Sequence, residues 1–138
     1  MADGDAFLPL RLPPGADLRR ALEAEAAAFA PEGCFVVSGI GSLRDPRLRL
    51  AGRHEAAAWP GDFELLTLAG TLTADGAHLH MSIAGPDGAV LGGHVVEGNA
   101  VRTTVEVLLC RPAGWRLSRA ADPATGYAEL QVVRRDGP

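Results

Sequence analysis

The stretch Phe63–His94, FELLTLAGTLTADGAHLHMSIAGPDGAVLGGH, decides the fold. It holds three largely apolar segments of strand length, separated by Ala74-Asp75-Gly76 and by Gly85-Pro86-Asp87-Gly88. Both separators are strong turn signals. Connections this short join antiparallel neighbours, so the stretch predicts successive hairpins of one sheet.

Outward from this stretch, the sequence predicts one helix and several further strands. Asp17 can cap a helix over Leu18–Ala30, whose apolar side chains fall on one stripe, and Pro31 and Gly33 end it. A single early helix on a mainly antiparallel sheet is an α+β fold. The other strands are predicted at 35–40, 101–110, around Trp115 and at 127–133, with a turn at Gly39-Ile40-Gly41-Ser42.

Length and composition limit the classes of protein that need consideration. The chain has 138 residues, 47% apolar and 22% charged, which fits one folded domain and excludes a disordered chain. Its net charge is −4, so it is a poor candidate for a stand-alone DNA-binding protein. All 13 basic residues are arginines, which excludes chemistry that needs a lysine.

Neither a targeting segment nor a membrane span is visible in the sequence. The N-terminal residues are acidic, and no run approaches the ~18 apolar residues of a transmembrane helix. We therefore expect a cytoplasmic protein that is not inserted in a membrane. Cys34 and Cys110 lie in apolar surroundings without Cys-x-x-Cys spacing, which predicts two buried thiols rather than a disulfide.

Three of the four histidines lie close together in the sequence. His78 and His80 are two apart in a predicted strand, so their side chains leave the same face of the sheet. Hairpin pairing would bring His94 alongside them, and Gly92-Gly93 before it permits a bulge or a close approach of another backbone. Three imidazoles form one face of a metal site and leave a position open.

Alternatives remain at this stage. The histidines can equally be polar residues on a half-exposed face, and a register that puts His94 on the opposite face leaves no site. His54 is expected on the surface, from where it could reach the cluster of a neighbouring subunit. Glu64 and Glu106 lie within apolar strands and need a partner, which is an arginine, backbone amides or a metal-bound water.

Several motifs occur in an order that is typical of one family. They include Arg11–Leu18 (RLPPGADL), Gly61–Gly70 (GDFELLTLAG), His78-Leu79-His80, Gly92-Gly93-His94 and Asp122–Tyr127 (DPATGY). With these motifs the chain resembles the plants-and-prokaryotes-conserved (PPC) domain from about Leu10 to Val133. We therefore expect a single PPC-like domain over 1–138, with its core at about 10–133.

The resemblance carries implications for assembly and for metal binding. It implies a homotrimer, and it implies a metal, with zinc expected, at the positions of His78, His80 and His94. Plant members lack this histidine set, and their association with DNA depends partly on AT-hook motifs. This chain has no Arg-Gly-Arg-Pro core of an AT-hook, so DNA binding transfers poorly.

Three functions follow, in order of preference. The first is a trimeric PPC-type protein of unknown cellular role whose metal site is structural or holds a small ligand, without established catalysis. The second is a metal-dependent enzyme in which Glu64 or Glu106 is the general base for a metal-bound water. The third is a DNA-associated or protein-binding regulator with an arginine patch, for which an ordinary solvated loop is the alternative. The patch residues are Arg44, Arg47, Arg49 and Arg53.

Overall fold

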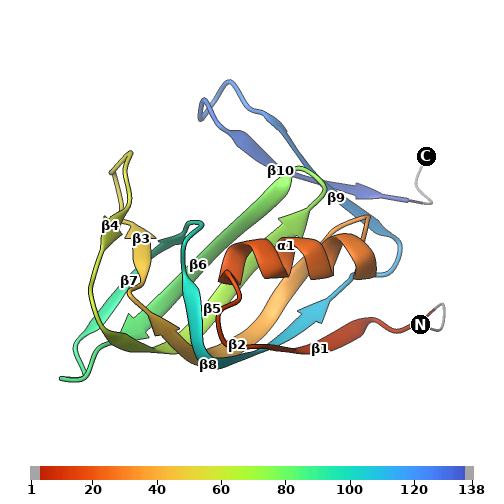
Figure 1. Ribbon diagram of the computed structural model, residues 1–138. Helices are drawn as coiled ribbons and strands as arrows, with labels where there is room; N and C mark the ends of the chain where they lie inside the picture. Colours follow the sequence, from red (N-terminus) through yellow and green to blue (C-terminus); the bar gives the residue numbers. More distant parts are fainter. Residues whose placement is uncertain (1–3, 136–138) are drawn as a thin grey trace.

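The computed structural model describes residues 4–135 and holds one helix and ten strands (Figure 1). Eight strands form one antiparallel sheet in the order β1-β8-β2-β5-β6-β7-β3-β4, and β9 and β10 form a separate hairpin. The predicted α+β fold is confirmed. The elements are β1 (Phe7–Leu12), α1 (Leu18–Phe29), β2 (Cys34–Arg44), β3 (Arg47–Arg49), β4 (Ala57–Ala58), β5 (Asp62–Thr73), β6 (Gly76–Ala84), β7 (Val90–Val95), β8 (Ala100–Cys110), β9 (Trp115–Ala121) and β10 (Ala128–Arg134).

The helix α1 begins where its sequence predicts and ends one residue earlier, at Phe29, with Ala30 as its C-cap. The Asp17 carboxylate accepts a hydrogen bond of 3.1 Å from the backbone N–H of Arg20, which satisfies one free donor of the first turn. The backbone N–H of Ala30 donates to Ala26, and Pro31 follows. One stripe of the helix is buried, formed by Leu18, Leu22, Ala26 and Phe29. In the described part of the chain no helix is both long and apolar enough to cross a membrane.

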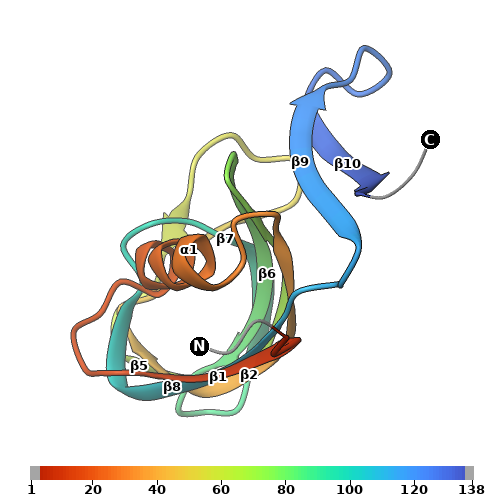
Figure 2. The same cartoon turned by 90° about the vertical axis from the view of Figure 1, so that its right-hand side faces the viewer.

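The sheet curves around α1, which covers one of its faces (Figure 2). We call the covered side the inner face and the opposite side the outer face. Because side chains alternate along a strand, every second residue points inward. The inner face supplies most of the hydrophobic core, including Leu43, Leu65, Leu68, Leu72, Leu79, Met81, Ile83, Val95, Val105 and Leu109.

Some strands were not expected from the sequence. β1 contains Pro9, but it lies at an edge of the sheet, where a proline is tolerated. β3 and β4 have only 3 and 2 residues; β3 pairs with β7 on one side and with β4 on the other. The predicted turn at 39–42 is wrong, because these residues continue β2. At Gly39 an added Cβ would lie 3.0 Å from the Cβ of Leu68, so the missing side chain makes room for the core.

The hairpin β9–β10, which we call the arm, projects from the body of the domain (Figure 2). Leu117 is its buried anchor, and the backbone N–H of Leu117 donates to the carbonyl of Glu32 at 2.7 Å. The N–H of Arg119 donates to Asp75 at 2.8 Å. These contacts hold the first strand of the arm beside the β5–β6 turn.

Candidate metal centre

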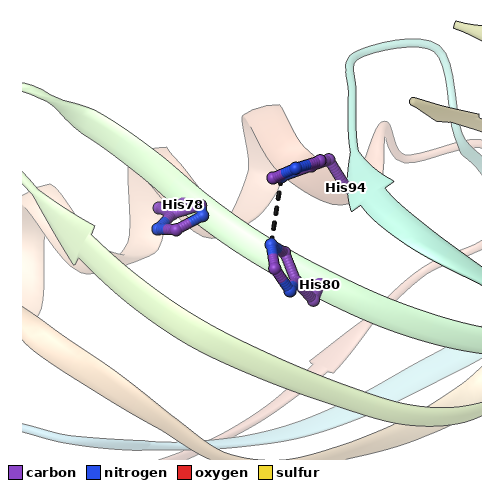
Figure 3. A group of neighbouring side chains, drawn as sticks. All are labelled: His78, His80 and His94. Atoms are coloured by element: carbon purple, nitrogen blue, oxygen red, sulfur yellow. Dashed lines mark hydrogen bonds between the residues drawn. The ribbon is translucent and has the colours of Figure 1, made fainter. Parts of the chain in front are cut away.

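The predicted convergence of His78, His80 and His94 occurs within one subunit (Figure 3). His78 and His80 leave the outer face from β6, and the register pairs His80 directly with His94 of β7. One ring nitrogen from each of the three lies within 4.8 Å of those of the other two. His78 and His80 are exposed and His94 is half-buried, so solvent reaches the cluster.

The three rings are already in mutual contact. A hydrogen bond of 3.0 Å joins Nε2 of His80 to Nδ1 of His94, so one of these nitrogens carries a proton and the other accepts it. The centroid of the His78 ring lies 5.0 Å from the centroid of the His80 ring and 5.7 Å from that of the His94 ring. Tetrahedral zinc with nitrogen ligands needs N···N separations of about 3.3 Å. Small rotations of exposed side chains close that difference, so the donor set fits a divalent ion.

Two glycines let the backbone come close at this site. At Gly93 an added Cβ would lie 2.9 Å from the carbonyl oxygen of Arg49, so the missing side chain lets β3 approach β7. Gly70 of β5 has φ +140°, and an added Cβ there would overlap the carbonyl oxygen of His78. The close approach expected from Gly92-Gly93 is therefore present at Gly93, and Gly70 does the same on the other side of β6.

Burial and nearby positive charges favour the neutral form of two of the imidazoles. Burial lowers the pKa of His78, and the nearby charges of Arg119 and His80 lower it further. Burial also lowers the pKa of His94, with Arg49 as the next cause. A neutral imidazole is the form that binds a metal, because its lone pair is free.

The arm brings two charged groups to the cluster that the sequence did not point to. The guanidinium of Arg119 donates a 2.7 Å hydrogen bond to the hydroxyl of Thr71, which is the cross-strand partner of His78. Glu129 of β10 is also close enough to His78 to raise its pKa, although less than Arg119 lowers it. These residues lie 25 to 51 positions after the histidines, and no motif connects them, so only the tertiary structure reveals them.

The other candidate residues lie outside the cluster. Glu64 pairs with Ala84, four residues along β6 from His80, or about 13 Å at ~3.3 Å per residue. Glu106 lies on β8, three strands from β6, or about 14 Å at ~4.8 Å per strand. Both are exposed, as is His54. Glu64 does not share a face with Leu68, because a bulge in β5 turns Leu68 inward.

The arginines that were considered as a patch have different surroundings. Arg44 forms an ion pair of 3.3 Å with Asp62, whereas Arg49 is the cross-strand partner of His94. Both cysteines are free thiols, Cys34 buried on the inner face and Cys110 only half-buried. Burial raises the pKa of Cys34 to about 11.

A curved antiparallel sheet closed by one helix, with a three-histidine cluster on its outer face, defines a small β-rich domain with a candidate metal centre. The Plants and Prokaryotes Conserved (PCC) domain, the family abbreviated PPC above, matches residues 3–111. The chain belongs to this family. The match ends after β8, so the arm lies beyond it.

Individual relatives agree with this assignment. The chain is 43% identical over 126 residues to the bifunctional protein GlmU of a Synechococcus strain, covering 91% of this chain and 20% of that protein. It therefore spans about a fifth of the length of the GlmU proteins from two Synechococcus strains that it matches. An AT-hook motif nuclear-localized protein of Arabidopsis thaliana is 30% identical over 94 residues, covering 59% of this chain and 24% of that protein.

Solved structures share the whole architecture. A hypothetical protein from Salmonella has a TM-score of 0.89 at 36% identity, with 94% of each chain covered. A protein from Archaeoglobus fulgidus described as metal-containing has a TM-score of 0.77 at 25% identity, covering 92% of this chain and 94% of that one. Proteins provisionally named as DNA-binding, from Bacteroides thetaiotaomicron and Ralstonia eutropha, are 18% and 17% identical and show the fold alone.

Proposed function

We propose that this PPC domain binds one divalent metal ion, zinc, through His78, His80 and His94. The observation that carries the proposal is the presence of three ring nitrogens within 4.8 Å of one another on two adjacent strands. The description of the Archaeoglobus relative as metal-containing supports it. Neutral imidazoles suit zinc, and three protein ligands leave one position for water or another group.

The site is better suited to holding a ligand than to turnover. A bound metal ion supplies a positive charge and an open coordination position. The two expected general bases, Glu64 and Glu106, lie more than ten ångströms away by strand geometry within one subunit. We therefore propose a binding or regulatory role in the cytoplasm, with metal-dependent catalysis and association with DNA as the alternatives.

We also propose that the protein is a homotrimer. The outer face carries large apolar side chains that α1 does not cover, namely Phe35, Val37, Ile40 and Leu66. Exposed apolar groups on a sheet are characteristic of a surface that another chain covers. Sedimentation velocity should give a mass of three chains, and a monomer at micromolar concentration would refute the trimer without affecting the metal site.

Metal content tests the metal site. Protein purified without a histidine tag should contain about one zinc per chain by elemental analysis, and His80→Ala should lose it because two imidazoles do not hold zinc. His54→Ala is the matched control, because His54 is an exposed histidine outside the cluster. No metal in the parent after zinc is offered, or an undiminished zinc content in His80→Ala, would refute the proposal, whereas loss of zinc in His54→Ala as well would show that this exposed histidine also contributes.

A further inference from the structure

Two arginines from different elements flank the histidine cluster. Arg49 of β3 is the direct cross-strand partner of His94 on the outer face, which places their Cβ atoms about 5 Å apart. Arg119 of the arm binds Thr71, which is the cross-strand partner of His78. The cluster therefore has a guanidinium at each end, contributed by β3 and by β9.

Both guanidinium groups have donors to spare. Arg49 donates one hydrogen bond, to the carbonyl of Arg53 at 3.2 Å. Arg119 donates to Thr71 and to the carbonyl of Ala128, and its Nε is buried without a hydrogen-bond partner among residues 4–135. In the same part of the chain neither arginine forms an ion pair with a carboxylate, whereas five other pairs do form. A guanidinium has five N–H donors, so each of the two arginines keeps at least two on its terminal nitrogens that make no hydrogen bond within residues 4–135.

A carboxylate of the arm, that of Glu129, opposes the two positive charges. Glu129 lies near His78, and its Oε1 accepts a 3.1 Å hydrogen bond from the hydroxyl of Thr125. Its effect on His78 is smaller than that of Arg119, and it is not among the groups that act on His94. Asp75 accepts a hydrogen bond of 2.8 Å from the backbone N–H of Arg119, but it is not among the groups that act on His78 or His94. The charged side chains that do act on these two histidines, apart from the histidines themselves, are Arg49, Arg119 and Glu129, so positive charge prevails at the cluster.

We propose that Arg49 and Arg119 bind a small oxyanion, a carboxylate or a phosphate group, at the open side of the three-histidine site. The inference rests on the proposed metal site and deepens it by naming the class of ligand. Guanidinium groups match the planar and tetrahedral oxygens of these anions, and charge-assisted hydrogen bonds are roughly twice as strong as neutral ones. The ligand would complete the coordination that three histidines leave open.

The test uses the full chain loaded with Co²⁺, whose visible spectrum reports directly on its ligands. Titration with acetate and, in a separate arm, with inorganic phosphate should change the spectrum saturably, and the tighter of the two identifies the anion class. Arg119→Gln and Arg49→Gln should each weaken binding by about tenfold or more, because each removes a charge-assisted contact. Arg49→Gln leaves the arm intact, so the result does not depend on the folding of the arm.

Two control variants share the arm. Arg116→Gln removes an arginine that already pairs with Glu32 at 2.6 Å, and it should leave anion affinity unchanged. Glu129→Gln removes the opposing carboxylate and should leave the affinity equal or tighter. Stoichiometric cobalt with no spectral response to either anion, or with the affinity of the unaltered protein retained in both arginine variants, would overturn the inference and leave the metal site standing. Failure to bind cobalt would overturn the metal site and this inference together.

Discussion

The two faces of the same sheet differ sharply in what they bury. The inner face, under α1, holds leucine and valine side chains that solvent does not reach, such as Val105 at 0% exposure. The outer face exposes Val37 at 53%, and it also carries the histidine cluster. Both sets come from the same strands, because alternate residues point to opposite sides. The inner face therefore accounts for the stability of the fold, and the outer face is available for binding.

The largest expected effect is at Gly70, which lets β5 lie close to β6, the strand that carries two of the histidines. Gly70→Ala should lower the free energy of unfolding by at least about 3 kcal/mol, because a strained φ and an overlap with the His78 carbonyl act together. Chemical denaturation measures this. Gly88→Ala is the control, since Gly88 also has a positive φ, +80°, but no atom within 4 Å of an added Cβ.

The Gly88 variant should lose only about 1 kcal/mol, the cost of the left-handed conformation alone. Equal losses in the two variants would show that β5 and β6 can separate at Gly70 without cost. The predicted role of Gly70 in positioning His78 would then be wrong.

The second prediction compares the two faces directly with one substitution. Val105→Ala on the inner face should cost about 2 kcal/mol, because it leaves a cavity in the core. Val37→Ala on the outer face should cost less than about 0.5 kcal/mol in an isolated chain. Urea denaturation at several protein concentrations measures both values. A cost at Val37 that approaches the cost at Val105 and depends on protein concentration would indicate that another copy covers the outer face.

The smallest effect concerns thiol reactivity. The thiolate is the reactive form, and a pKa of about 11 leaves Cys34 with roughly a hundredfold less thiolate at pH 8 than an ordinary cysteine. Alkylation of native protein, followed by mass spectrometry of peptides, should therefore label Cys34 much more slowly than the same residue in urea. Equal rates in the two states would mean that the inner face opens frequently.

Much of the fold and part of the candidate site can be predicted from residue patterns. The turn signals at 74–76 and 85–88 lie where β6 meets its neighbours, and Asp17 does cap the helix. The histidine spacing was enough to predict that His78 and His80 share one face, whereas the register that pairs His80 with His94 decided that the third ring joins them. Local periodicity carries this information, because strand alternation and hairpin length are properties of short segments.

Other features depended on contacts between distant segments. β3 and β4 are too short for a pattern, and the bulge in β5 turns Leu68 to the inner face although simple alternation would place it on the same face as Glu64. The glycines of β2 resemble a turn signal, but they serve close packing against β5 and β8. In each case the pairing partner decides the conformation, and a partner far away in the sequence leaves no local trace.

The sequence by itself determined the α+β class, the family and the three candidate ligands, because these follow from periodicity, turn chemistry and motif order. Only the tertiary structure decided what surrounds the ligands. It brings Arg49 and Arg119 to the two ends of the cluster and leaves Glu64 and Glu106 outside it. The physical reason is that register and packing set distances between side chains on separate strands, and a local sequence pattern reports only on its own strand.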